Sequence, residues 1–371
     1  MTAKEVGKIQ DIQFLRGIAV LLVFTHHIPG KLPHLEVFDW IHRHFDVQVG
    51  VDIFFAISGY VITLSLVGLL SAAGATRLDL PLWRTFWKRR IARLTPSALF
   101  WAGLSVALLP LITSSEGQMF ATLASIPFAL LNVYNMYFTV CFDGGLIGNI
   151  CPSYTATHVY WSLSLEMQFY LAFSVALMVL SLVRLAVIAG ALAALSIIVF
   201  GDPVHLNGIL KFLYGSFHRG YALIIGILIA VFFDVQIRNV MARIPRKHVA
   251  ISILVGILIV AAAPRFLPYH IGNLVVASIS GIILMLSLRG DAVSSRSPGR
   301  WICWIGERSY SFYLSHTLAI YAVGAVANYL DVTSESSTAL KTSVVALALL
   351  ASLGLASIGY RSIESRSFGL R

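Results

Sequence analysis

Charged side chains are scarce in this sequence: Asp, Glu, Lys and Arg make up only 12% of its 371 residues, while hydrophobic residues make up 58%. A soluble globular protein of this composition would leave much apolar surface in contact with water. Long linkers rich in Pro, Ser or Gly are also missing, so an appended soluble domain is not expected. We therefore predict one all-α integral membrane domain over residues 1–371, a bundle of transmembrane helices.

Acidic residues are fewer than basic ones, 17 against 27, which gives a formal net charge of +10. The basic residues gather in clumps between apolar runs, as membrane orientation requires, and we predict no nucleic-acid partner. The first apolar run ends in His26-His27-Ile28-Pro29-Gly30 and offers no small-residue cleavage site. We therefore expect it to be a retained span and not a signal peptide.

Apolar segments long enough to be candidate membrane helices, which need about 20 mostly apolar residues, occur along the whole chain. They lie near residues 12–28, 49–70, 91–112, 119–139, 160–182, 184–200, 219–233, 249–263, 271–288, 310–328 and 341–359. Five basic segments, near the N-terminus, at 77–93, 238–247 and 289–308 and in the tail, should all face the cytoplasm, which requires an even number of crossings. Because residues 119–139 contain Pro127, we predict that they form an interfacial or re-entrant piece. About ten spans then remain, with both termini cytoplasmic.

Cysteine is rare, with three copies at Cys141, Cys151 and Cys303. The predicted topology places residues 140–159 outside the membrane, where conditions are oxidising, so a Cys141–Cys151 disulfide is predicted. Two unpaired thiols are the alternative. Cys303 is expected to be an inert buried thiol.

Ionisable side chains inside a membrane span are costly and therefore mark candidate functional positions. Arg16 and His27 are separated by three helical turns and share a helix face to within about 20°, whereas His26 points about 80° away from Arg16. His27 is therefore the preferred catalytic candidate, with His26 behind it. The alternative is a core histidine satisfied by a carbonyl group. His316 shares a face with Ser309 and is either a further candidate or a bridge between helices.

Two carboxylates, Asp52 and Glu166, are predicted in the same outer half of the membrane as His27. Asp52 lies on a stripe with Ala56, Gly59 and Thr63, a small-residue face that lets another helix approach closely; for Ser58, packing and function stay equally open. Histidine with a carboxylate on its second nitrogen is the arrangement that a general base needs to activate a sugar hydroxyl. We therefore predict a catalytic role for His27, Asp52 and Glu166.

The predicted inner side carries Arg90 and Arg93, which share a helix face and extend into a span. This spacing suits a phosphate-binding fork, although orientation and lipid headgroups explain neighbouring Lys88. His34, His42 and His44 show no metal-specific spacing, and we predict no metal site.

Several short motifs occur in a fixed order along the chain. They are Leu15-Arg16-Gly17 leading to His27, Gly50-Val51-Asp52 with Ser58-Gly59, Arg90 and Arg93 before Pro96, Trp161-Ser162-Leu163 with Glu166, Ser309-Tyr310-Ser311 with Tyr313 and His316, and Tyr360-Arg361 with Glu364. Together they make the chain resemble the acyltransferase-3 family of membrane proteins. The resemblance covers nearly the whole sequence.

That resemblance implies ten core helices and an O-acyltransferase, with acetyl the first expectation for the acyl group. It implies acyl-CoA as co-substrate, with no bound cofactor, and a hydroxyl of a surface or secreted glycan, free or lipid-linked, as acceptor at a bacterial inner membrane. It also implies that His27 is catalytic and that Arg90 and Arg93 are essential. We group Arg16 with this arginine pair as donor-binding, and we keep Ser58 and Tyr313 as further site candidates.

The sequence also departs from that family pattern. A histidine often stands two residues before the tryptophan in the family, but here Val159 does, so His158 is given no role. A second acidic residue often follows the position of Glu166, where Met167 stands here. Some members carry a fused secreted domain, which is not expected in this chain.

Two other classes of function remain. A transporter or flippase for a lipid-linked glycan would use the same charged residues to line a pathway, but it predicts inverted repeats or paired broken helices, which the sequence does not show. A purely structural membrane partner would leave the cost of burying His27, Asp52 and Glu166 unexplained.

Overall fold

The computed structural model describes residues 9–113, 115–144, 155–200, 208–295, 297–333 and 335–366. Two compact units are interleaved along the chain. Unit 1 comprises Met1–Leu22, Phe45–Lys88 and Glu166–Glu307, and unit 2 comprises Val23–His44, Arg89–Leu165 and Arg308–Arg371. The following paragraphs describe each unit by itself.

The regular secondary structure of the described residues is entirely helical, and these residues contain no strand. Helices assigned wholly to unit 1 are η1 (Val47–Val49), α4 (Gly50–Ala72), α10 (Leu182–Phe200), α11 (Gly208–Phe217), η4 (His218–Gly220), α12 (Tyr221–Leu228), η5 (Ile229–Phe233), α13 (Asp234–Arg243), α14 (Arg246–Phe266), α15 (Tyr269–Ser287) and α16 (Gly299–Glu307). Helices of unit 2 are α3 (Glu36–His44), α6 (Leu109–Ile112), α7 (Glu116–Leu130), α8 (Tyr134–Gly144), α17 (Ser309–Tyr329), α18 (Thr338–Gly359) and η6 (Tyr360–Glu364). Unit boundaries fall inside α2 (Gln10–His27), α5 (Leu80–Ala107) and α9 (Tyr160–Val179).

Each apolar segment predicted from the sequence contains a helix, which confirms the all-α prediction. Within the described residues, five helical stretches are long and apolar enough to cross a membrane. They are Val47–Ala72, Tyr160–Val179, Gly208–Arg243, Arg246–Phe266 and Thr338–Glu364. Shorter apolar helices lie at Leu182–Ser196 and Ile271–Ser287.

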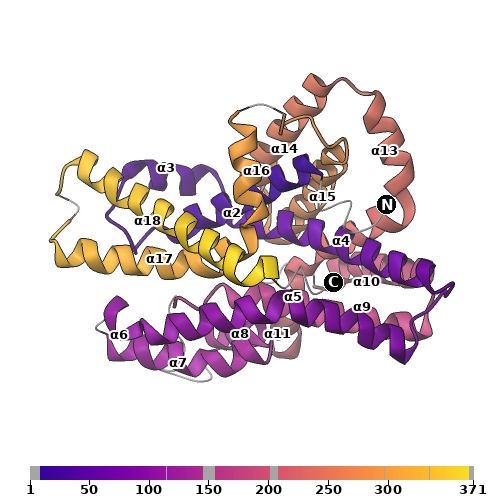
Figure 1. Cartoon of the computed structure of the whole chain (residues 1–371), viewed down its shortest axis with the longest axis horizontal. Coiled ribbons are helices and arrows are strands. Elements are labelled where there is room, and N and C mark those ends of the chain that lie inside the picture. The colour runs from indigo at the N-terminus through magenta and orange to yellow at the C-terminus, as the bar shows by residue number, and fades with distance from the viewer. Residues whose placement is uncertain are drawn as a thin grey trace. The chain divides into compact units, whose positions relative to one another are not determined.

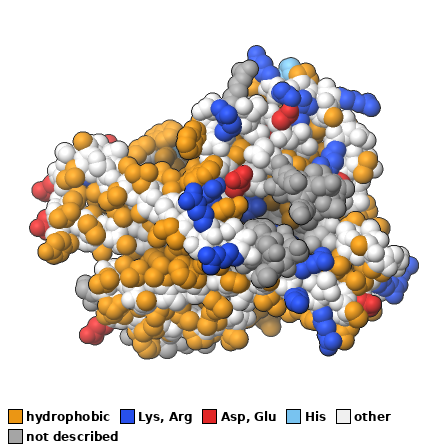
Figure 2. Space-filling model, viewed as in Figure 1, with side chains coloured by type: hydrophobic (Ala, Val, Ile, Leu, Met, Phe, Trp, Pro, Cys, Tyr) orange, Lys and Arg blue, Asp and Glu red, His pale blue; other side chains and the backbone are white. Residues whose placement is uncertain are grey.

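The outward faces of several helices are apolar, the reverse of a water-soluble helix. On α14 the exposed residues recur at helical spacing and are Ile251, Leu254, Val255, Leu258 and Ile259. Hydrophobic side chains likewise cover most of the surface over α6, α7 and α18, at the left in Figure 2. Continuous apolar surface of this kind is stable against lipid and unfavourable in water. The protein is therefore a helical membrane protein.

The segment at 119–139, predicted to be an interfacial or re-entrant piece, is broken into α7 and α8. The break includes Asn132, whose φ of 55° lies in the left-handed region, a conformation that asparagine tolerates better than most residues. Across the break the rings of Phe128 and Tyr137 stack with centroids 4.3 Å apart. The backbone N–H of Tyr134 donates to the Ser164 hydroxyl at 3.1 Å and so joins α8 to the first turns of α9.

Two helices of unit 1, α4 and α12, pack backbone to backbone. A Cβ atom on Gly59 would lie 2.0 Å from the Leu223 carbonyl oxygen, and one on Gly226 would lie 2.2 Å from the Ala56 carbonyl oxygen. Only glycine permits such an approach. The predicted close approach of a helix to the small-residue face of α4 is thereby confirmed.

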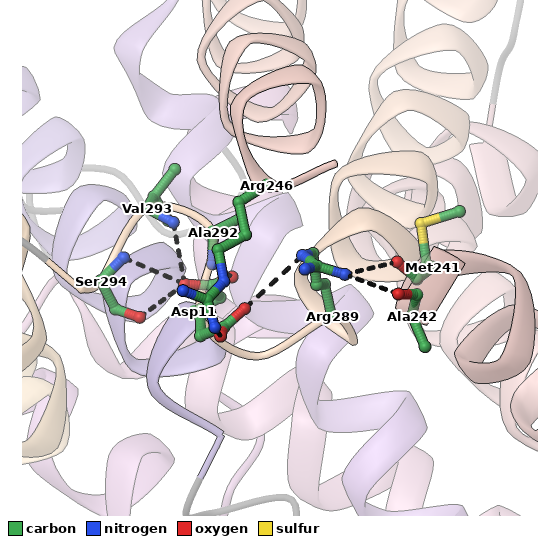
Figure 3. Close-up of polar contacts among 9 residues, drawn as sticks. Asp11, Met241, Ala242, Arg246, Arg289, Ala292, Val293 and Ser294 are labelled. Atoms are coloured by element: carbon green, nitrogen blue, oxygen red, sulfur yellow. Dashed lines mark hydrogen bonds and ion pairs between the residues drawn. The ribbon is translucent and has the colours of Figure 1, made fainter. Parts of the chain in front are cut away.

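The first turn of α2 is fixed to the segment after α15 by the carboxylate of Asp11 (Figure 3). It accepts the backbone N–H groups of Ala292, Val293 and Ser294 at 2.6, 3.1 and 3.1 Å, and the Ser294 hydroxyl at 2.7 Å. Converging N–H groups stabilise an anion strongly. Since Asp11 is fully buried, this contact holds the unit 1 part of α2 in place.

Basic residues in the same region also make specific contacts (Figure 3). Arg289 donates to the carbonyl groups of Met241 and Ala242, at 2.9 and 3.1 Å, in the last turn of α13. Arg246 forms an ion pair with Asp291. A cation beside the last carbonyl groups of a helix satisfies acceptors that the helix itself leaves open.

In unit 2, α17 and α18 run side by side (Figure 1). Gly359 permits this packing at one end, because a Cβ atom there would lie 2.6 Å from the Ser311 hydroxyl. Glu364 then accepts the backbone N–H of Ser311 at 2.9 Å and also its hydroxyl. The two C-terminal motifs of the sequence are thus joined by hydrogen bonds.

Candidate active site

The last residue of α2, His27, has a defined ring orientation. Its Nδ1 lies 2.8 Å from the carbonyl oxygen of Val23, one helical turn earlier. Because a carbonyl oxygen can only accept a hydrogen bond, Nδ1 carries the proton in the neutral ring. The Nε2 atom of His27 is then an unprotonated acceptor, as a general base requires.

His316, from α17, contacts the same ring. Its Nδ1 lies 2.8 Å from the Tyr313 carbonyl oxygen and is therefore the protonated nitrogen. Its Nε2 lies 3.3 Å from Nδ1 of His27 and accepts a share of that proton. The rings are 5.0 Å apart at 69°. The structure thus brings together His27 and His316, and His316 supports the tautomer that leaves Nε2 of His27 open.

Among the described residues, Nε2 of His27 is a buried nitrogen with no hydrogen-bond partner. Buried polar atoms are nearly always satisfied, so an exception calls for an explanation. His27 lines a cavity of about 330 Å³ that lies wholly within unit 2. A ligand hydroxyl in that cavity would supply the missing donor.

Four histidines line the cavity: His26, His27, His42 and His158. The His26 and His42 rings lie 6.3 Å apart, and those of His27 and His158 lie 6.1 Å apart. Sequence reasoning assigned no role to His42 or His158. His158 lies in the turn before α9, one position from where the family pattern expects a histidine. This near match was the signal by which sequence reasoning could have selected His158.

The electrostatics of His158 follow from its position. It is buried, and burial together with the positive charge that His27, His26 and Lys31 can carry lowers the pKa of His158 well below its usual value. His158 is therefore neutral at physiological pH.

Several hydrogen bonds join segments of unit 2 that are distant in the sequence. Tyr313 and Ser162 share a hydrogen bond of 2.6 Å between their hydroxyl groups. Thr317 donates to the carbonyl of Ala156 at 2.7 Å, and Tyr310 donates to the carbonyl of Leu94 at 2.7 Å. Tyr313 is half-buried and acts here as a link between α17 and α9.

The other predicted site residues are distributed as follows. Asp52 is buried in unit 1 and accepts a hydrogen bond of 2.5 Å from Arg219, an ion pair that sequence reasoning missed. Glu166 accepts a hydrogen bond from the Tyr170 hydroxyl, also in unit 1. Half-buried Arg16 and Ser58 belong to unit 1 as well. Their catalytic or donor-binding roles stay predictions.

The arginine pair lies on α5 in unit 2. Arg90 is buried and Arg93 is half-buried, whereas Lys88 and Arg89 are exposed. Burial distinguishes Arg90 from the exposed cations that the positive-inside rule alone explains.

Two further predictions concern cysteines and metals. Cys151 lies outside the described residues, so the Cys141–Cys151 bond stays a prediction. Cys303 is buried and unbridged, and its thiol lies 3.3 Å from the Gln10 carbonyl oxygen. Among the residues that the structure describes, no group of three His, Cys, Asp or Glu side chains is arranged to hold a metal ion.

The sequence profile of a family described as an acyltransferase domain, of the acyltransferase-3 type, matches residues 9–361. The chain belongs to the acyltransferase-3 family. The matched range covers segments of both units, so family membership is not confined to one of them.

Several curated relatives of this acyltransferase-3 protein are similar over most of its length. The putative peptidoglycan O-acetyltransferase YrhL of Bacillus subtilis (strain 168) is 29% identical over 339 residues, covering 83% of this chain and 48% of that protein. The peptidoglycan O-acetyltransferase OatA of Listeria monocytogenes is 28% identical over 340 residues, covering 83% and 49%. A putative O-acetyltransferase of Staphylococcus aureus (strain COL) is 27% identical over 338 residues, covering 85% and 51%. The chain spans about half the length of these relatives, and no solved structure matches it.

Proposed function

We propose that this acyltransferase-3 protein transfers an acyl group, acetyl in the first instance, from acyl-CoA to a hydroxyl of a glycan. The observation that carries the proposal is the buried Nε2 atom of His27, an acceptor without a partner among the described residues, in the wall of a 330 Å³ cavity. The relatives' names, which refer to O-acetyltransferases, support this class of reaction.

The reaction follows from this geometry. Nε2 of His27 takes the proton of the glycan hydroxyl while the hydroxyl oxygen attacks the thioester carbonyl carbon. The carbon–sulfur bond then breaks, and the departing thiolate receives the proton from the imidazolium. His316 and the Val23 carbonyl keep the ring in the required tautomer. We keep the catalytic role that the sequence predicts for Asp52 and Glu166 as part of the proposal, and hydrogen-bond donors of the cavity would stabilise the oxyanion.

The donor and the membrane complete the proposal. Arg16, Arg90 and Arg93 would bind the phosphates of acyl-CoA from the cytoplasm, since guanidinium groups form paired hydrogen bonds to phosphate. The protein would lie in a bacterial inner membrane with about ten spans and both termini cytoplasmic, as the distribution of basic residues favours. The acceptor would be acylated at the outer side.

The test is acyl transfer from radiolabelled acetyl-CoA to a glycan fraction by purified protein reconstituted in lipid. Replacement of His27 by Ala should lower the rate by about 10² to 10⁴, the usual cost of losing a general base. His26→Ala is the matched control, because it changes the neighbouring cavity histidine and should reduce the rate less. Near wild-type transfer by His27→Ala, at equal protein and equal acetyl-CoA binding, would disprove the assignment.

A further inference from the structure

The described lining of the cavity has an uneven distribution of charge. It contains Lys31 and several histidines, and it contains no Asp or Glu. A cavity of this composition has a positive or neutral potential and disfavours a cationic ligand. The acceptor that enters it should therefore be neutral or negatively charged.

Two ring nitrogens of the cavity can only accept hydrogen bonds. His42, on α3, donates from Nδ1 to the Phe38 carbonyl at 2.7 Å, so its Nε2 is unprotonated in the neutral ring. Among the described residues, Nε2 of His42 and Nε2 of His27 are both buried without a partner. A ligand that satisfies both must bring two donors. Since ammonium donors are repelled by Lys31, hydroxyl groups fit best.

Lys31 is held in place in the loop that follows α2. Its Nζ lies 4.8 Å above the ring of Tyr321, another cavity residue. Its backbone packs against α17, where a Cβ atom on Gly324 would lie 2.4 Å from the Lys31 carbonyl oxygen. Burial lowers the pKa of Lys31, which reflects the cost of charging it in a poorly solvated place. An anion beside it would offset that cost.

We propose that this cavity takes an acidic sugar as the acceptor, with hydroxyl groups on His27 and His42 and its carboxylate beside Lys31. This inference rests on the proposed function, since it names the acceptor class of the same site. The cavity volume of about 330 Å³ is at the lower end of the usual range for ligand pockets, about 300 to 1,000 Å³, and suits one sugar ring at a time.

The experiment measures equilibrium binding of methyl glucuronide and methyl glucoside to the purified full-length protein in lipid nanodiscs. These two sugars differ only in a carboxylate against a hydroxymethyl group. Wild-type protein should bind the glucuronide about tenfold more tightly, as one charge-assisted hydrogen bond allows. Lys31→Met should reduce that ratio to about one, whereas His42→Phe should weaken both sugars by a similar factor and keep the ratio.

Lys88→Met, which removes an exposed cation of α5, is the control and should bind both sugars as the wild type does. Equal affinity of wild-type protein for the two sugars, or a preference that survives Lys31→Met, would overturn the acidic acceptor. Failure of the glucuronide to saturate the protein would overturn it as well. Binding requires no acyl transfer, so these outcomes are independent of the His27→Ala activity test.

Discussion

His27 and His42 make the same local hydrogen bond, from Nδ1 to the backbone carbonyl four residues earlier. This bond needs only a helical turn, so the chain sets the tautomer of each ring without a carboxylate. Asp52 and Glu166 have other partners within unit 1, Arg219 and Tyr170. A direct hydrogen bond from a carboxylate to His27 is therefore not required for the tautomer that catalysis needs.

The Asp52–Arg219 pair leads to a stability prediction at the residue scale. Both side chains are buried, so removing one partner leaves an uncompensated charge. Arg219→Met should lower the free energy of unfolding by about 3 kcal/mol. The double variant Asp52→Asn with Arg219→Met should recover part of that loss, because it removes both charges. Thermal unfolding of the wild type, the single variant and the double variant in detergent measures these differences in stability. A double variant no more stable than Arg219→Met would contradict the ion-pair account.

At the scale of the helices, the backbone contact between α4 and α12 depends on single glycines. Gly59 lies against the Leu223 carbonyl, whereas a Cβ atom on Gly68, on the same helix, would have no neighbouring atom within 4 Å. The two glycines therefore differ in packing while sharing helical backbone.

Gly59→Ala should destabilise the protein by about 1 to 3 kcal/mol, because the added methyl group forces α4 and α12 apart. Gly68→Ala, the matched control, should be neutral or stabilising by about 0.5 to 1 kcal/mol, since alanine favours a helix. Unfolding midpoints of the two variants in the same detergent provide the comparison. Equal midpoints would show that the helices do not pack as closely as described.

The positions of the long apolar helices could be predicted from the sequence because apolar runs identify them directly. The small-residue face of α4 was also predictable, because the spacing of its residues alone places them on one side of a helix. The partner of that face, α12, was not, because no local pattern identifies which distant helix packs against it. The ion pair of Arg219 with Asp52 was not predicted either. In the sequence Arg219 stands at the edge of an apolar run, as a membrane-boundary residue does, and no local pattern connects it with Asp52.

The site was predictable in part. His27 and His316 occupy motif positions on predicted helices, and sequence reasoning selected both. In the structure Nε2 of His316 lies 3.3 Å from Nδ1 of His27. His158 and His42 were not selected, because His158 lies in a turn and His42 lies in the short helix α3, where periodicity gives no information. Their contribution depends on the tertiary arrangement that forms the cavity.

At the scale of the whole molecule, apolar side chains on the outward helix faces and buried polar side chains are the distribution expected of a protein that is surrounded by lipid. The cavity with its unsatisfied histidine nitrogens lies in unit 2, while Asp52 and Glu166 belong to unit 1. The family match extends over both units. Acyl transfer in the cell should therefore need the intact chain.

The central claim is that His27 is the general base in the acylation of a glycan. The most direct test is mass spectrometry of the host's surface polysaccharide. Cells that carry the wild-type gene, no gene, His27→Ala or His26→Ala should be compared at equal membrane levels of protein. We predict acyl esters with the wild-type gene, fewer with His26→Ala, and none above background with His27→Ala or without the gene. Wild-type acylation in the His27→Ala cells would contradict the account.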